Sequence, residues 1–465
     1  MNVGLDTIAL GLAASVGGLV ALVYVQRRPQ TLLALVAYSL VLTQSFPVFS
    51  VGSRVVNLST DHLLIPLALA LAALAPRTWR GDWPWPRFGV PFVLFVGWAV
   101  VTFLFSLVTR GPAGHVPALI ELSKLMLYTW LFVPAAVFIR NERDARRLLG
   151  HLAVGAVIVL VVGYGQWWTI PDRMSANIVS TFGSLARADV ITAKNVLAVY
   201  LACWLVVVLA LFSRGVVGLL PGLLLLAAIG LIIVASYSRA ALLAIGVGVA
   251  WLAVTATASS EARRVPTPRL PLIVAVVMMG VVVVLGWSAY RGFGPMTPVG
   301  QLLNLFATTR EYSYSGLVAG ATGTLRLRLL WEGLEAFLDA PIVGYGFNVR
   351  ALHLPKLAVV DNFPLDVALD TGVIGLALML WLMWEVLQHL RGVQRRASVA
   401  GDRLLAALAW AAGGAVMVVY AASVSGSFPY SSRILGPMVL ATASLSVWSM
   451  HTGTTPRMEH GEKAA

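Results

Sequence analysis

Three arginines and one acidic pair are the side chains of this sequence whose chemistry stands out from an apolar background. Arg239 separates two apolar runs in IIVASYSRAALLAIGV, and Arg326 and Arg328 open an amphipathic stretch further along the chain. Asp361 and Asn362 stand just before another apolar run. A guanidinium group stays charged and presents a planar fork of donors, which matches phosphate oxygens. These residue types indicate a phosphorylated or diphosphate ligand.

Each of these residues also has a purely structural interpretation. Asp361 could be a general base that accepts a proton from an attacking hydroxyl. Alternatively, Asp361 or Asn362 could cap the following helix by bonding its first amides. Arg239 could bind a ligand within the membrane, or could extend to lipid headgroups. Arg326 and Arg328 are two residues apart and lie on different helix faces, so only one of them is expected to face a site.

Other polar residues carry weaker signals. Asp366 and Asp370 are one turn apart, and could line a cation path or complement a helix N-terminus. Lys194 and Asn195 open another apolar run, where a polar cap is the default interpretation. The histidines have no metal-ligand spacing, and the lone Cys203 excludes an intramolecular disulfide, so no metal site is predicted. Nucleotide-binding glycine loops and a GxSxG motif are also missing from the sequence.

The elements that must position these residues are membrane helices. Of the 465 residues, 59% are hydrophobic and 11% are charged. Apolar runs long enough to cross a bilayer recur along the whole length. They predict an all-α polytopic membrane protein with about 12–13 transmembrane helices, near 5–25, 31–50, 61–76, 88–108, 117–139, 148–170, 190–212, 216–235, 240–258, 270–288, 366–390, 403–422 and 434–450.

The net charge is +13, and most of the arginines fall in the short loops between the apolar runs. Alternating the runs across the membrane leaves only Arg54, Arg110, Arg173, Arg187, Arg239 and Arg433 in the short connections of one side. The richer side is cytoplasmic by the positive-inside rule, which argues against nucleic-acid binding. The prediction divides the chain into helices over 1–288, an outward loop over 289–365, helices over 366–450 and a disordered cytoplasmic tail over 451–465.

The outward loop is predicted to contain one amphipathic helix. Leu325, Leu329, Leu330, Leu334 and Phe337 recur at helical spacing within TLRLRLLWEGLEAFLD. Asp339-Ala340-Pro341 ends this helix. The GYG sequence over 344–346 follows as a turn in which the backbone approaches a neighbour closely.

Taken together, three motifs resemble the superfamily of O-antigen ligases and O-antigen polymerases, which are bacterial membrane glycosyltransferases. The motifs are SYSRAALLA, RLRLLWEGLEAFLDAPIVGYGF and DNFPLDVALDTGVIGLAL, and GSLARADVITAKNVLAVYL adds a further similarity. Their order and their common outward location make the combination specific. The resemblance covers about 180–390, and the rest of the chain by topology alone.

The resemblance implies a GT-C-like fold in the bacterial cytoplasmic membrane and a glycan donor carried on a polyprenyl diphosphate. Transfer to an acceptor hydroxyl would proceed with inversion, outside the cell and without metal or cofactor. Arg239 and Arg326, or less favourably Arg328, would hold the donor diphosphate. Asp361 stands where the ligase branch has a proposed histidine base, which leaves the acceptor open among glycan, lipid and protein. Asn362, Tyr345, Asn195 and Lys194 are candidate supporting residues.

Two other classes of function fit parts of the pattern. A secondary transporter suits twelve to fourteen helices and could use Asp366 and Asp370 for ion coupling, although transporters often show an internal repeat that is missing here. A flippase or assembly subunit without catalytic activity is the third class. The sequence leaves the sugar, the choice between ligase and polymerase, and the oligomeric state open.

Overall fold

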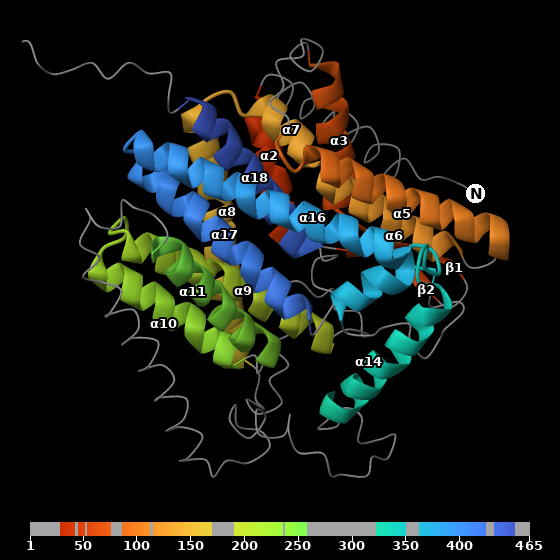
Figure 1. The fold of residues 1–465 in the computed structure, drawn as a ribbon. Coiled ribbons are helices and arrows are strands. Elements are labelled where there is room, and N and C mark those ends of the chain that lie inside the picture. The colour runs from red at the N-terminus through yellow and green to blue at the C-terminus, as the bar shows by residue number, and fades with distance from the viewer. Residues whose placement is uncertain are drawn as a thin grey trace, which may run out of the picture.

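The computed structural model of the protein describes residues 28–41, 45–51, 54–75, 86–111, 115–169, 190–235, 238–257, 322–349, 362–424 and 432–451. In chain order the elements are α2 (Pro29–Val41), β1 (Ser45–Val51), β2 (Arg54–Ser59), α3 (Asp61–Leu74), α5 (Gly89–Arg110), α6 (His115–Trp130), α7 (Phe132–Phe138), α8 (Glu142–Thr169), α9 (Val190–Ser213), α10 (Leu219–Ala235), α11 (Arg239–Thr257), α14 (Thr322–Asp339), α16 (Phe363–Val399), α17 (Arg403–Ser423) and α18 (Ser432–His451). Figure 1 shows a bundle of long helices, with α14 standing apart from it and touching the first part of α16.

Seven helices in the described part of the chain are long and apolar enough to cross a membrane. They run over Gly89–Thr109, Ala118–Phe138, Glu142–Tyr164, Val196–Ser213, Phe363–Val399, Arg403–Ser423 and Ile434–His451. Shorter apolar helices cover Pro29–Leu40, Asp61–Leu74, Leu219–Ile233 and Ala240–Ala256. The predicted all-α polytopic membrane fold is therefore confirmed. The spans predicted at 5–25 and 270–288 lie outside the described residues.

The span predicted over 31–50 is not a single helix. Helix α2 ends at Val41, and β1 then pairs antiparallel with β2, with Ser45 opposite Ser59 and Val51 opposite Arg54. The β1 sequence SFPVFSV is rich in aromatic and β-branched residues, which favour strands. Its proline also lacks the amide that a helix interior needs. Hydropathy alone could not separate this apolar hairpin from a membrane helix.

Helix α17 is the central element of the bundle. It packs against α9 and α11 on one side and against α16 and α18 on the other, as Figure 1 shows. Small residues allow this close packing: a Cβ added at Gly414 would lie 2.7 Å from a methyl group of Val206. One added at Gly248 of α11 would lie 2.6 Å from a methyl group of Val418. Small residues at helix contacts are typical of membrane bundles, where close packing supplies the attraction.

The two ends of the bundle differ in chemistry. At one end, arginine guanidinium groups lie over tryptophan rings, at 4.6 Å for Arg146 over Trp448, 4.7 Å for Arg214 over Trp410 and 4.3 Å for Arg391 over Trp251. We call this end the basic side. The opposite end, where α5 ends at Arg110 and α16 begins next to Asn362, is the loop side.

Candidate functional site

Helix α16 begins on the loop side with an asparagine cap. The Asn362 side chain accepts a hydrogen bond from the Leu365 amide at 3.0 Å. Its amide nitrogen also donates to the carbonyl oxygen of Val424, just past the end of α17, at 3.1 Å. Asn362 therefore caps one helix and joins it to the next. Since Asn362 is the cap, the start of α16 does not need Asp361 for this purpose; Asp361 itself lies outside the described residues.

Three turns further on, α16 is broken at Gly372. This residue has φ 70° and ψ −173°, which only glycine adopts readily. The break releases backbone groups around Leu369, Asp370 and Val373 from their helical partners. Within a membrane such groups must find partners in the protein, because no water is present to satisfy them.

The segment that follows α14 supplies those partners. The amides of Tyr345 and Gly346 donate to the carbonyl oxygens of Leu369 at 2.7 Å and Asp370 at 3.0 Å. In the other direction, the Val373 amide donates to the Pro341 carbonyl oxygen at 2.8 Å. We call residues 341–346 the docking turn. The predicted GYG turn is thus confirmed, and it fixes the position of α14 relative to α16.

Glycines make this approach possible. Gly344 has φ 75°, and a Cβ there would lie 2.7 Å from the backbone of Asp370 and Gly372. A Cβ at Gly372 would collide with the carbonyl oxygen of Ile342. The two backbones therefore touch where side chains would otherwise separate them. Substitution at either glycine should disturb the contact between α14 and α16.

Helix α5 supports the break from its other face. The Trp98 indole nitrogen donates to the carbonyl oxygen of Thr371 at 2.8 Å. Gly375 leaves room mainly for the Thr371 side chain, since a Cβ there would lie 2.4 Å from the Thr371 Cβ and 3.2 Å from the Trp98 ring. Gly346 of the docking turn in turn lies against Ser106. Sequence reasoning missed Trp98 and Ser106, because both sit in an apolar run and acquire their role only through contacts with distant residues.

The helical repeat of α14 separates Arg326 from Arg328. Gly333 and Ala336 are buried, and Leu329, Leu330 and Phe337 pack with them against Leu365 and Leu369 of α16. Position 326 precedes 329 and 330 by three and four residues, so it lies on this α16-facing side. Position 328 instead shares its side with Trp331, which is 65% exposed. Leu334, one of the leucines that predicted this helix, is also exposed.

The packing of α11 against α17 sets the level of Arg239. The two helices are antiparallel, with Gly248 beside Val418. Arg239 is the first residue of α11, about two and a half turns before Gly248. The same distance along α17 from Val418, nine residues, extends past its last residue, Ser423. The backbone of Arg239 therefore lies on the same side of the bundle as the end of α17, which is the loop side.

Other predicted residues are placed as follows. Tyr345 packs with the α14–α16 cluster, and its hydroxyl donates to the Ala336 carbonyl oxygen at 3.1 Å, so it holds the docking turn to α14. Asp366 and Asp370 are 3% and 2% exposed, which places both carboxylates inside the protein.

Lys194 and Asn195 lie within α9 rather than before it. They are therefore not its cap, because α9 begins at Val190.

Comparison with known protein families agrees with this arrangement. Residues 222–380 match a family model described as O-antigen ligase. We call this matched region, residues 222–380, the O-antigen ligase domain. The domain extends from α10 to the middle of α16, so it contains Arg239, Arg326, the docking turn and Asn362. The predicted resemblance is confirmed, and Lys194 and Asn195 fall outside the O-antigen ligase domain. No curated protein matches the chain.

Proposed function

We propose that the protein transfers a glycan from a polyprenyl diphosphate to an acceptor hydroxyl at the outer face of a bacterial cytoplasmic membrane. One observation carries this proposal: the docking turn joins α14 to the break in α16 on the loop side. This contact holds the α16-facing side of α14, which includes position 326, against the start of α16, which Asn362 caps. Arg239 begins α11, which packs against α17 and also opens on the loop side.

The orientation follows from the distribution of charge. Arg146, Arg214 and Arg391 lie on the basic side, which the positive-inside rule assigns to the cytoplasm. The loop side, which carries the Asn362 cap and the docking turn, would then face outward. Helix α18 ends on the basic side near Trp448, so the C-terminus would be cytoplasmic.

In the proposed reaction, the acceptor oxygen attacks the anomeric carbon of the donor while Asp361 accepts its proton. The bond between that carbon and the diphosphate oxygen breaks, and polyprenyl diphosphate leaves with the bonding electrons. A single displacement of this kind inverts the anomeric configuration. Arg239 and Arg326 would bind the diphosphate and stabilise the charge that grows on it. No metal ion is assigned a step.

The position of Arg326 supports its choice over Arg328. Position 326 lies on the packed face of α14, whereas position 328 lies with the exposed Trp331. An arginine near a low-dielectric surface stabilises phosphate charge more strongly than one in water. Asn362 and Tyr345 would act as positioning residues: Asn362 caps α16, and Tyr345 holds the docking turn to α14.

The experiment that tests the proposal measures consumption of the donor. Purified protein in nanodiscs is mixed with the host's lipid-linked oligosaccharide and membrane extract, and release of polyprenyl diphosphate is followed. We expect release by wild type and strong reduction in Asp361→Asn. Full activity of Asp361→Asn would remove Asp361 as the base while keeping the transferase. No release by wild type, together with uptake of a solute into vesicles, would favour a transporter instead.

A further inference from the structure

A cluster of cationic and hydroxyl side chains joins α16 to α18 on the basic side. In the last turn of α16, the Arg396 guanidinium donates from Nη2 to the Ser449 hydroxyl of α18 at 3.3 Å. Two turns earlier on α16, the His389 Nε2 lies 2.7 Å from the Ser446 hydroxyl oxygen. Arg396, and Arg87 just before α5, are close enough for their charges to act on the His389 imidazole. Two guanidinium groups from distant parts of the chain therefore lie around one imidazole of α16.

Both guanidinium groups are placed to bind an anion. Arg87 and Arg396 are exposed, and no carboxylate in the described part of the chain forms an ion pair with either of them. The Arg396 side chain lies over Gly392, where an added Cβ would be 3.5 Å from Nη1, so it points back along α16 toward His389. The bond to Ser449 uses one of its five N–H groups. The cluster therefore offers uncompensated positive charge together with the remaining donors.

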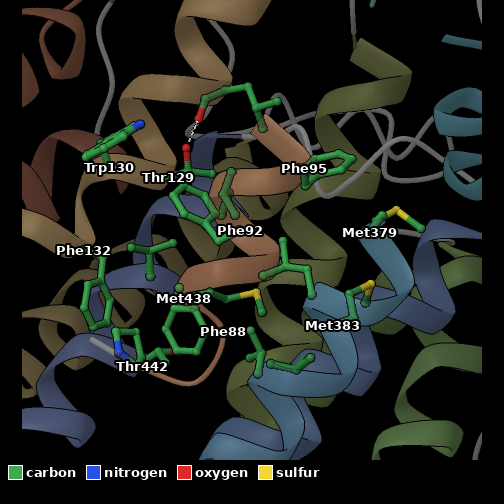
Figure 2. A pocket seen from close by; sticks show the side chains of 18 of the residues that line it. Phe88, Phe92, Phe95, Thr129, Trp130, Phe132, Met379, Met383, Met438 and Thr442 are labelled. Atoms are coloured by element: carbon green, nitrogen blue, oxygen red, sulfur yellow. Dashed lines mark hydrogen bonds between the residues drawn. The ribbon is translucent and has the colours of Figure 1, made fainter. Parts of the chain in front are cut away.

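An apolar cavity of about 190 Å³ begins next to this cluster. Figure 2 shows Phe88, Phe132 and Thr442 among the side chains around it. The centroid of the Phe88 ring lies 5.4 Å from that of Phe132 and 5.4 Å from that of the His389 imidazole. The Thr442 carbonyl oxygen accepts a hydrogen bond from the Ser446 hydroxyl at 2.6 Å. The described residues that line the cavity include no charged side chain, so the cavity suits a hydrocarbon chain.

The cavity opens to the side of the bundle close to the level of the cluster. Helix α5 has 22 residues and is about 33 Å long, close to the thickness of a hydrocarbon core. Arg87, which precedes it, therefore lies at the level of lipid headgroups on the basic side. Val93 lines the cavity, is 45% exposed and lies only about 6 Å along α5 from Gly89. A hydrocarbon chain in the leaflet on the basic side can therefore reach the cavity sideways.

We propose that this cluster and cavity bind an anionic phospholipid from the leaflet on the basic side. Its phosphate binds between Arg87 and Arg396, and one acyl chain occupies the apolar cavity. The positive-inside rule makes this the cytoplasmic leaflet, whose surface carries anionic lipids. The site lies on the opposite side of the bundle from the docking turn, so it goes beyond the proposed glycan transfer and does not depend on it.

The choice of an anionic phospholipid follows from charge and from position. Guanidinium groups bind phosphate oxygens through paired, charge-assisted hydrogen bonds. A zwitterionic headgroup would bring its own cation toward the same two arginines, which is unfavourable. A soluble anion would match the charge but would leave the adjoining cavity without an occupant. Basic pockets between membrane helices on the cytoplasmic side are sites of the kind that bind anionic lipid headgroups.

The test compares two lipid probes on the intact protein, with neither donor nor acceptor present. Protein in phosphatidylcholine nanodiscs receives phosphatidylglycerol that carries a diazirine in one acyl chain, and photolabelled peptides are mapped by mass spectrometry. Phosphatidylcholine with the same chain is the comparison probe. We expect saturable labelling of the cavity lining in α5, α7 or α18. Half-saturation should be about twentyfold lower for the phosphatidylglycerol probe, because each of two arginines near a headgroup contributes about fivefold.

Matched variants separate the headgroup site from the cavity. Arg87→Gln and Arg396→Gln should each reduce the preference about fivefold, and Arg396→Lys should keep most of it. Arg395→Gln is the control, because it removes the same charge from the next position of α16, which is exposed and faces another direction, and it should leave the preference unchanged. Val93→Trp should abolish cavity labelling by both probes. Val101→Trp, on the same helix, 50% exposed and outside the cavity lining, should not.

The outcomes separate a phospholipid site from other occupants. Equal half-saturation for the two probes in the wild type, or a preference that survives the combined Arg87→Gln and Arg396→Gln substitutions, would overturn the inference. Displacement of the phosphatidylglycerol probe by inorganic phosphate would assign the cluster to a soluble anion, and displacement by lipid-linked oligosaccharide would assign the cavity to the donor; either result would also overturn it. Selective labelling by a protein that never releases polyprenyl diphosphate would keep this site and refute only the proposed function.

Discussion

Replacing Gly372 by alanine should undock the docking turn from α16. The new Cβ would collide with the Ile342 carbonyl oxygen, and a backbone at φ 70° and ψ −173°, which is essentially limited to glycine, would cost about 1–3 kcal/mol. Moving the turn away would break the hydrogen bonds made by the amides of Tyr345, Gly346 and Val373, at about 1 kcal/mol each. The collision and the strain act only while the turn stays docked, and the hydrogen bonds are lost only when it moves away. The three bonds favour docking by about 3 kcal/mol, roughly a hundredfold, and the collision in Gly372→Ala should offset that preference.

Hydrogen exchange in nanodiscs, read by mass spectrometry, measures this directly. Peptides covering 341–349 should exchange much faster in Gly372→Ala than in wild type, while α17 peptides stay protected. Release of polyprenyl diphosphate should fall as the docked fraction falls, because α14 carries Arg326. Gly97→Ala is the matched control, since a Cβ there meets no atom within 4 Å. Unchanged exchange over 341–349 in Gly372→Ala would refute the role assigned to the break.

Substitutions at four further positions test how the loop side is held together. Arg326→Ala should abolish donor release in the nanodisc assay, whereas Arg328→Ala should retain most of it; the reverse order would contradict the face assigned to each. Asn362→Ala should lower thermal stability by about 1–2 kcal/mol through the lost cap, and Asn362→Asp should restore the cap. Trp98→Phe removes the bond to Thr371 and should lower stability by about 1 kcal/mol, seen as faster exchange near the break. If exchange near the break in α16 is unchanged in Trp98→Phe, the bond from Trp98 to Thr371 does not stabilise the break.

Short stretches of sequence predicted the helices and their ends, because these depend on hydropathy and on residues close together in the chain. Apolar runs predicted the membrane helices, leucine spacing predicted α14, and Asp339-Ala340-Pro341 predicted its end. The polar residues before α16 predicted a cap, although the sequence could not choose between Asp361 and Asn362. The structure makes that choice through the bond from Leu365.

The remaining features depend on contacts between distant residues. Nothing near Trp98 in the sequence shows that its indole will reach Thr371, 273 residues away. Gly372 stands within the DNFPLDVALDTGVIGLAL motif, but its close approach to Ile342 depends on where α14 lies. The β1–β2 hairpin was missed because an apolar strand and an apolar helix segment have the same hydropathy.

Donor release by an Arg239 variant tests the central claim most directly. The matched control is Arg214→Ala. It also removes one arginine at the end of an apolar helix, but on the basic side, where the guanidinium lies over Trp410. Both variants and the wild type are compared for release of polyprenyl diphosphate from the same lipid-linked oligosaccharide. The account predicts that release is lost in Arg239→Ala and kept in Arg214→Ala. Release by Arg239→Ala at the wild-type rate would contradict a diphosphate-binding site on the loop side.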